Sequence, residues 1–188
     1  DLVAELLAEQ RAVLASVDED IALFEGELAG LEKEQASIAA LIAAETTPAD
    51  DEPAPADDGA VQYYRPVPGA ITSRFGPRLH PILGYTRMHA GVDMTAAQGQ
   101  AIRALTGGRI ILASSNGGYG NTVIVDHGGG LTSLYAHQSS FNVRYGDIVD
   151  GGDVIGYAGA SGLATGPHLH FETRINGTPV DPAPYLAG

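Results

Sequence analysis

Apolar residues recur every seven positions through the first 45 residues of this 188-residue chain, and this repeat restricts what its N-terminal part can form. Two columns of the repeat, three residues apart within each heptad, are apolar at ten of twelve positions: Leu7, Leu14, Ile21, Leu28, Gln35 and Ile42 in one, and Val3, Gln10, Val17, Phe24, Leu31 and Ile38 in the other. The remaining faces are rich in Ala and Glu, which favour helix. The pattern predicts an α-helical coiled-coil segment over residues 1–45.

Two arrangements would bury such a stripe. The favoured one is the end of a longer coiled coil, in which the helix pairs with a second copy of itself or with a segment outside this sequence. The other is a single amphipathic helix that packs against the rest of the chain.

An acidic, proline-rich stretch over residues 46–62 follows the helix, and Pro48 is expected to end it. With almost nothing to bury, this stretch predicts a solvated, semi-extended linker. Residues 1–60 carry 16 acidic and 2 basic side chains, whereas residues 61–188 carry 7 acidic and 8 basic ones. Neither part has a basic stripe, so we expect no nucleic-acid partner.

The chain has no cysteine, which excludes a cysteine zinc cluster and a disulfide scaffold. It also has no apolar run near the ~20 residues that a membrane helix needs. Because the sequence opens on Asp1, we expect a fragment or a mature product from which an export signal or anchor has been removed.

From residue 63 to residue 188 the composition changes to frequent glycine and short β-branched runs between turns. Strong turn signals stand at residues 126–130 and 176–177. No long helical period follows residue 61. The fold class predicted for 63–188 is therefore mainly β, with antiparallel strands. The candidate strands are residues 70–73, 108–113, 122–126, 131–136, 154–158 and 168–175.

Polar residues suited to metal binding and proton transfer lie in several of these segments. In the last strand, alternation places His168 and His170 on one face and an apolar set on the other. His89 and Asp93 are four residues apart, and Gly91 between them favours a loop that enters a strand at Val92 over a helix. Alone, that pair is best explained as a surface ion pair.

His137 ends the candidate strand 131–136, and alone it is uninformative. Its weight comes from its occurrence in the same β-rich stretch of ~125 residues as the other four. Together the five side chains are the inventory of a hydrolase that activates water on a metal with an open position.

Five motifs carry a resemblance to a known family: Ser73-Arg74-Phe75-Gly76-Pro77-Arg78, His89-Ala90-Gly91-Val92-Asp93, Tyr119-Gly120-Asn121, Leu134-Tyr135-Ala136-His137 and Thr165-Gly166-Pro167-His168-Leu169-His170-Phe171-Glu172. Residues 69–186 resemble the LytM/lysostaphin-like zinc metallopeptidases, bacterial enzymes that cut peptide bonds in peptidoglycan. The resemblance implies an antiparallel β-sheet metallopeptidase domain with Zn²⁺ at the floor of a narrow groove.

The resemblance also implies a division of roles. His89, Asp93 and His170 would bind zinc, and His137 and His168 would form the catalytic pair. Two neutral imidazoles and one carboxylate leave a tetrahedral position open for water. One spare histidine can accept the proton of the attacking water and the other can donate to the developing oxyanion or the leaving amine. The sequence leaves open which does which.

Other residues have weaker signals. We expect Arg78, Tyr119 and Asn121 to line the groove and bind substrate, although the end of a turn explains Asn121 equally well. Glu172 is either an acceptor that orients a zinc-bound imidazole or a surface carboxylate. The remaining histidines, His80 and His127, are expected in structural or surface roles.

The predicted function is a zinc-dependent endopeptidase that hydrolyses peptide cross-links or stem peptides of peptidoglycan. It would act in the cell envelope, secreted or membrane-anchored, under control through the coiled coil. The coiled-coil partner would be another protein or a membrane-anchored regulator, and the N-terminal segment could instead inhibit the enzyme by covering the groove. The alternative is a non-catalytic activator of a cell-wall amidase in cell division. A lipoyl-type carrier is excluded, because Lys33 in the helix is the only lysine.

Overall fold

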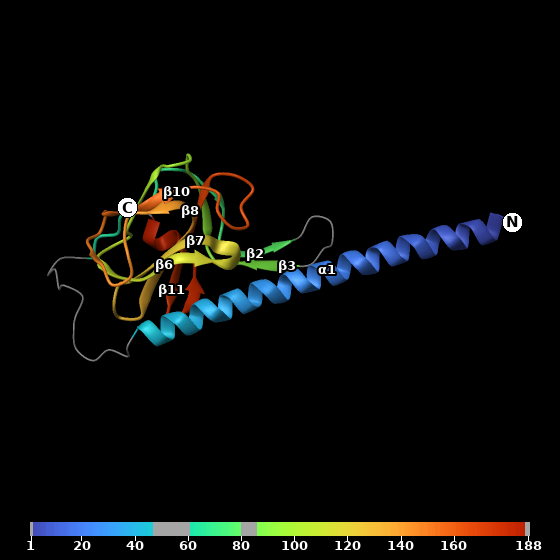
Figure 1. Cartoon of the computed structure of the whole chain (residues 1–188), viewed down its shortest axis with the longest axis horizontal. Helices are drawn as coiled ribbons and strands as arrows, with labels where there is room; N and C mark the ends of the chain where they lie inside the picture. The colour runs from blue at the N-terminus through green and yellow to red at the C-terminus, as the bar shows by residue number, and fades with distance from the viewer. Residues whose placement is uncertain (1, 47–60, 80–85, 187–188) are drawn as a thin grey trace. The chain divides into compact units, whose positions relative to one another are not determined.

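The computed structural model of the chain describes residues 2–46, 61–79 and 86–186 (Figure 1). Residues 47–60, most of the predicted linker, lie outside this description, and so does His80. The predicted helix is confirmed as α1, Leu2–Glu45. No helix within the described ranges is long and apolar enough to span a bilayer.

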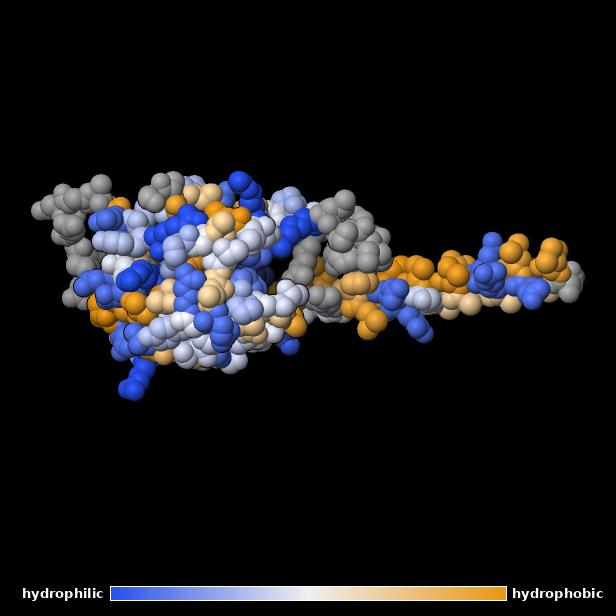
Figure 2. Space-filling view, turned by 90° about the horizontal axis from the view of Figure 1, so that it is seen from above, coloured by the Kyte–Doolittle hydropathy of each residue, from blue (hydrophilic) through white to orange (hydrophobic). Residues whose placement is uncertain are grey.

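The chain divides into two compact units, one of residues 1–37 and one of residues 38–188. In the first, both columns of the heptad stripe reach the surface, and apolar side chains are visible along this helical segment in Figure 2. Val3, Leu7, Leu14, Val17, Ile21 and Leu28 are between 37% and 63% exposed. The second unit holds the last two turns of α1 together with every strand.

Among the described residues the second unit contains twelve strands, and all their pairings are antiparallel, which confirms the predicted fold class. They are β1 (Ile71–Ser73), β2 (Gly76–Leu79), β3 (Thr86–His89), β4 (Val92–Thr95), β5 (Ala101–Arg103), β6 (Gly108–Asn116), β7 (Gly120–Asp126), β8 (Leu131–Phe141), β9 (Ile148–Val149), β10 (Val154–Ala158), β11 (His168–Ile175) and β12 (Thr178–Val180). Two short 3₁₀ helices, Gly117–Tyr119 and Ala183–Leu186, complete the described elements.

The main sheet has ten strands in the order β1-β4-β11-β8-β7-β6-β9, with β10, β5 and β12 attached beside this path. The hairpin β2-β3 forms a separate two-stranded sheet. Each of the six predicted strands has a counterpart, and β4 begins at Val92 as expected. His89 was expected in the loop before β4. It instead ends β3, because the hairpin register pairs it with Gly76.

Strand β11 lies inside the sheet, between β4 and β8, and its two faces differ as alternation predicted. Leu169 and Phe171 are fully buried in the main core, together with Tyr135 and Val123. His168, His170, Glu172 and Arg174 lie on the other face. That face is called the site face below.

The last two turns of α1 pack on the site face. Ile38 and Ile42 are 1% exposed and share a second apolar cluster with Ile111, Tyr119, Ile124, Leu134 and Ala136. Ala136 pairs with His170 across the ladder, and Leu134 pairs with Glu172. Residues directly opposite in antiparallel strands project to the same face. The end of the helix therefore lies on the sheet face that carries the histidines.

A bulge in β8 turns His137 to this face as well. Asn121 pairs with Gln138 and Val123 with Tyr135, so β8 holds one residue more than β7 over this stretch. His137 has a φ of 59°, in the left-handed region that few non-glycine residues adopt. Without the extra residue, alternation would point His137 into the core with Tyr135.

Candidate metal centre and active site

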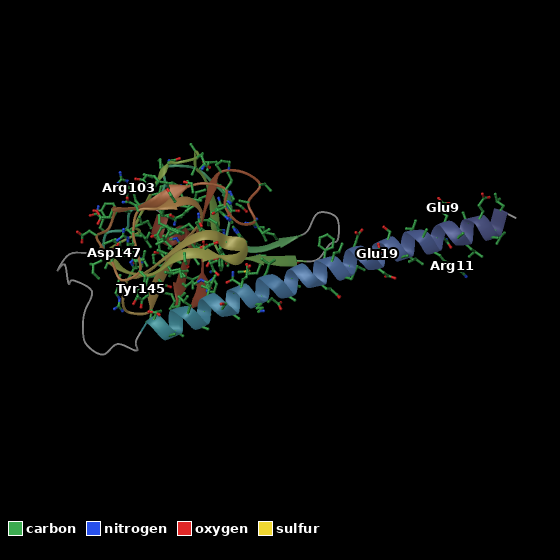
Figure 3. All side chains as sticks on the ribbon, in the orientation of Figure 1. Glu9, Arg11, Glu19, Arg103, Tyr145 and Asp147 are labelled. Atoms are coloured by element: carbon green, nitrogen blue, oxygen red, sulfur yellow. The ribbon has the colours of Figure 1, made fainter. Side chains whose placement is uncertain are left out.

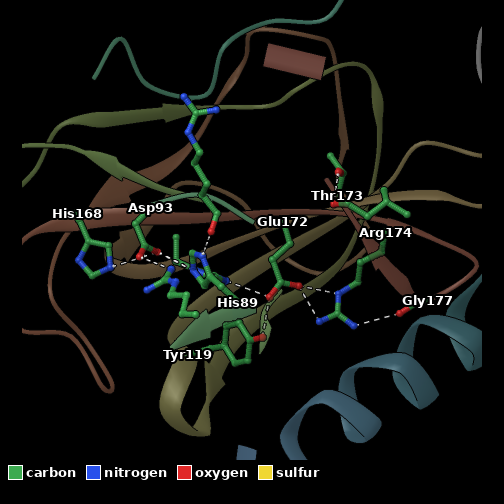
Figure 4. Close-up of polar contacts among 12 residues, drawn as sticks. His89, Asp93, Tyr119, His168, Glu172, Thr173, Arg174 and Gly177 are labelled. Atoms are coloured by element: carbon green, nitrogen blue, oxygen red, sulfur yellow. Dashed lines mark hydrogen bonds and ion pairs between the residues drawn. The ribbon is translucent and has the colours of Figure 1, made fainter. Parts of the chain in front are cut away.

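Three side chains from three strands converge on one point of the site face (Figure 4). They are His89 at the end of β3, Asp93 in β4 and His170 in β11. Asp93 Oδ1 lies 2.9 Å from His170 Nδ1 and 3.2 Å from His89 Nε2. The two imidazole nitrogens are 3.1 Å apart. Antiparallel pairing of Asp93 with His170 brings the carboxylate beside the imidazole.

Neighbouring acceptors determine which nitrogen of each imidazole carries a proton. His89 Nδ1 lies 2.8 Å from the carbonyl oxygen of Arg74, to which it must donate. His170 Nε2 lies 3.0 Å from Glu172 Oε1 and donates there. When neutral, both rings therefore direct a lone pair at the shared point.

Three electron-pair donors at these separations can hold a cation between them. Zinc binds nitrogen and oxygen at ~2.0–2.1 Å, so two ligands of a tetrahedral site lie about 3.3 Å apart. The three observed separations are close to that edge length. The residues thus fit a divalent metal such as zinc, with two imidazoles and one carboxylate.

Without a metal, protons shared in hydrogen bonds hold the three side chains together. Burial would raise the pKa of Asp93, but its contacts with His170 and His89 outweigh burial and hold that pKa far below its ordinary value. Burial lowers the pKa of His170, but the hydrogen bonds and charges of Asp93 and Glu172 outweigh burial. The net effect raises the pKa of His170 from its ordinary 6.5 to about 9. A metal must displace the proton of His170 to bind.

Two further imidazoles, His137 and His168, lie beside the three converging side chains. Their ring centroids are 4.7 Å apart, and the ring of His137 lies 6.0 Å from that of His170. His168 Nε2 approaches Asp93 Oδ1 to 3.9 Å. Side-chain exposures of 22% for His168 and 19% for Asp93 leave this side of the cluster accessible to solvent.

Backbone carbonyls fix the orientation of both rings. His137 Nδ1 lies 2.8 Å from the oxygen of Ser161, and His168 Nδ1 lies 2.9 Å from that of Gly166. Each Nδ1 therefore donates, which leaves each Nε2 with a lone pair when the ring is neutral. Burial, aided by the charges of His170 and His168, lowers the pKa of His137 to about 4, against the hydrogen bond to Ser161. His137 is thus a neutral proton acceptor at pH 7.

The three residues predicted to bind substrate occupy different environments. Arg78, 43% exposed, reaches Asp93 Oδ2 at 3.2 Å and so borders the cluster. Asn121 donates from Nδ2 to the carbonyl of Gln138 and from its backbone N–H to Ser161 Oγ, which ties the loop that orients His137 to β8. Tyr119 is buried, and its hydroxyl donates to Glu172 Oε1 at 2.6 Å. Substrate binding by these residues stays a prediction.

Glu172 is fully buried, so the sequence-based alternative of a surface carboxylate is wrong. Its Oε1 accepts from His170 and Tyr119, and its Oε2 accepts from the guanidinium of Arg174 at 2.6 and 2.7 Å (Figure 4). Burial would raise the pKa of Glu172, but these donors lower it, so the group is a carboxylate. Arg174 was not predicted to take part, although alternation along β11 from His168 gives its face.

His127 has the structural role expected for it. It is buried beside the turn after β7, with Nδ1 2.8 Å from the Gly107 carbonyl and Nε2 2.7 Å from Ser133 Oγ. These contacts join the turn after β7 to Gly107 and to strand β8, and they do not involve His89, Asp93 or His170.

Comparison with known proteins gives the family. The model described as "Peptidase family M23" matches residues 87–182. DD-carboxypeptidase/endopeptidase Mpg of Neisseria meningitidis is 51% identical over 112 residues, 60% of this chain and 26% of that protein. Murein hydrolase activator EnvC of Escherichia coli is 38% identical over 125 residues, 66% of this chain and 29% of that protein. The chain thus spans between a quarter and a third of these two relatives.

A crystal structure of a zinc-containing peptidase from Vibrio cholerae superposes with a TM-score of 0.63 at 32% identity, over 69% of this chain and 40% of that one. The family match spans more than half of the sequence and includes His89, Asp93, His137, His168 and His170. As the motifs implied, the chain belongs to Peptidase family M23, a family of metallopeptidases.

Proposed function

We propose that this protein is a zinc-dependent endopeptidase that hydrolyses peptide cross-links or stem peptides of bacterial peptidoglycan. The observation that carries the proposal is the convergence of three lone-pair donors on one point, with two further imidazoles beside them whose Nδ1 atoms are held by backbone carbonyls. Similarity to Mpg, named a DD-carboxypeptidase/endopeptidase, supports a peptidoglycan substrate. Similarity to a zinc-containing peptidase supports the choice of metal.

Zinc held by His89, Asp93 and His170 would supply a Lewis acid that polarises a carbonyl and makes water nucleophilic near neutral pH. His137, neutral at pH 7, is placed to accept a proton through Nε2. His168, the more exposed of the pair, would act in its doubly protonated form, donating from Nε2 to an oxyanion or a leaving amine. Arg78 holds Asp93 Oδ2, which leaves Oδ1 directed at the metal position.

A shallow cavity of about 480 Å³ begins next to this cluster and is a candidate for part of the peptide groove. Its lining includes Pro167, which precedes His168, and Thr95, which pairs with His168. Its lining is completed by Pro68, Gly69, Ala96, Ala97 and Gln100.

The test is digestion of purified sacculi by the full chain with added zinc, with mass analysis of the soluble fragments. Release of peptides cut at cross-links or within stems is expected, and His89→Ala should abolish it because one ligand is lost. Zinc-loaded protein that releases no peptide from sacculi would overturn the proposal. The fragment masses also name the bond that is cut.

A second candidate is a non-catalytic activator of a cell-wall amidase in cell division. Similarity to EnvC, named a murein hydrolase activator, is the observation in its favour. The complete set of three ligands and two free imidazoles favours the enzyme. Metal analysis separates the two: an activator without catalysis has no need of zinc, so metal-free protein that stimulates an amidase would select this candidate.

We further propose that regulation acts through the exposed seam of α1, covered by a helix of a partner protein or membrane-anchored regulator. Asp18 and Glu25 flank one column of the seam, Asp20 flanks the other, and all three are exposed. In a parallel pair of two copies, Asp20 would face Glu25 of the second copy, and like charges there repel. A partner helix with Lys or Arg at these flanks fits better than a second copy.

A peptidoglycan substrate would place the enzyme in the cell envelope.

A further inference from the structure

The C-terminal end of α1 and the metal-ligand His170 are connected on the site face by a short series of buried contacts. Glu172 is the central group. It lies two residues beyond His170 on β11, is fully buried, and accepts the Nε2 proton of His170 at 3.0 Å. Such a carboxylate fixes both the tautomer and the ring orientation of a metal-bound histidine.

Glu172 is itself held on two sides. The Tyr119 hydroxyl donates to the same oxygen that accepts from His170, at 2.6 Å. The Arg174 guanidinium, 1% exposed, holds the second oxygen and also donates to the Gly177 carbonyl at 3.1 Å. A buried ion pair of this kind needs exclusion of water and complete hydrogen bonding to be stable.

The helix end supplies that exclusion of water. Ile38 and Ile42 pack in one cluster with Tyr119 and with Leu134, the cross-strand partner of Glu172. Ala39 lies against Gly177. A Cβ added to Gly177 would lie 3.3 Å from the backbone oxygen of Ala39. Glu45 accepts a 2.6 Å hydrogen bond from the Tyr145 hydroxyl, which fixes the last turn of α1. Tyr145 is labelled near the C-terminal end of α1 in Figure 3.

We propose that the last two turns of α1 are a working part of the metal site: by covering Tyr119, Glu172 and Arg174 they keep His170 oriented, so metal affinity depends on the docked helix end. Tyr119, Glu172 and Arg174 are positioning residues in this scheme. The proposal rests on the proposed zinc-dependent function and adds to it a route by which a partner bound to α1 alters the site. It predicts that the helix end supports the enzyme rather than inhibiting it.

The test measures zinc affinity of the full chain by competition with a chelator. Glu172→Gln should weaken binding by about 10- to 100-fold, the range typical for loss of a group that orients a ligand. Tyr119→Phe and the double variant Ile38→Ala/Ile42→Ala should weaken it by about threefold or more, because they loosen the contacts without removing the carboxylate. Two matched controls should bind as wild type: Tyr64→Phe, on an exposed tyrosine, and Leu14→Ala/Ile21→Ala, on the exposed seam of the same helix.

A spectrum separates positioning from simple loss of stability. Co²⁺ at saturation should give altered d–d bands in Glu172→Gln and in the helix-end variant, whereas a variant that is merely less stable would regain the wild-type spectrum once loaded. If the double alanine variant does not fold, Ile38→Val/Ile42→Val replaces it, with the same direction of effect expected.

Each result is decisive. Wild-type affinity and spectrum in a folded helix-end variant would overturn the proposal, even if Glu172→Gln weakens binding. Wild-type zinc affinity and spectrum in Glu172→Gln would also overturn the proposal, because Glu172 would then not orient His170. Failure of the wild-type chain to bind zinc would reject the proposed function itself, a result distinct from both.

Discussion

His137 and His168 face one another across the open side of the cluster, with ring centroids 4.7 Å apart and each Nδ1 bound to a backbone carbonyl. Neither ring occupies a place among the three donors that converge on the metal position. The pair is therefore free to move protons, which gives a direct test of the division of roles.

His137→Ala and His168→Ala should each reduce kcat by about 10²–10⁴-fold, the usual contribution of a positioned acid or base. Both should still bind one zinc ion, because His89, Asp93 and His170 are unchanged. Peptide release from sacculi and metal analysis on the same samples measure the two effects. Loss of zinc from both variants would contradict the assignment.

The position of His137 shows where sequence reasoning stops. Heptad spacing predicted α1, and alternation predicted the two faces of β11, because both patterns follow from local geometry. The bulge in β8 has no such signal, and simple alternation would have pointed His137 into the core. The motif resemblance grouped it with His168, and the strand register supplies the geometric reason why the two rings lie together.

Local sequence pattern did not predict the surroundings of Glu172 either. Alternation gave the face on which it lies, together with Arg174, but the burial of both depends on segments distant in the sequence. Those segments are the 3₁₀ turn that carries Tyr119 and the end of α1. Their convergence is a property of tertiary packing.

Arg174→Met should destabilise the protein by about 3–5 kcal/mol, the cost of leaving one member of a buried ion pair without its partner. Glu172 would then be a buried carboxylate without its cation, since Arg174 is 1% exposed and bonds its Oε2 through two nitrogens. Urea unfolding of the metal-free protein measures the loss. The exposed Arg144→Met serves as the matched control and should change stability little.

Metal-free protein should lose stability as the pH rises from 6.5 to 9. The pKa of His170 is about 9 in the folded state against an ordinary 6.5, so the folded state binds its proton more tightly. That stabilisation is fully present below pH 6.5 and is lost as the pH passes through 9, an effect of about 3 kcal/mol. Urea titrations after chelation, at pH 6.5 and pH 9, check the sign. Zinc-loaded protein is the control, because the metal replaces that proton; unfolding free energies of the metal-free form that rise toward pH 9 would contradict the prediction.

The full chain should be monomeric at pH 7 and low salt, although an apolar seam is exposed along α1. Like charges at the flanks of the seam, Asp18, Asp20 and Glu25 among them, oppose pairing of two copies. Self-association should rise below about pH 4, where carboxylates become protonated, and with added salt, which screens the repulsion. Sedimentation equilibrium measures both trends.

A heptad peptide with the same apolar columns and lysine flanks should bind at pH 7, whereas its glutamate counterpart should not. A salt-independent dimer at pH 7 would show instead that a second copy covers the seam.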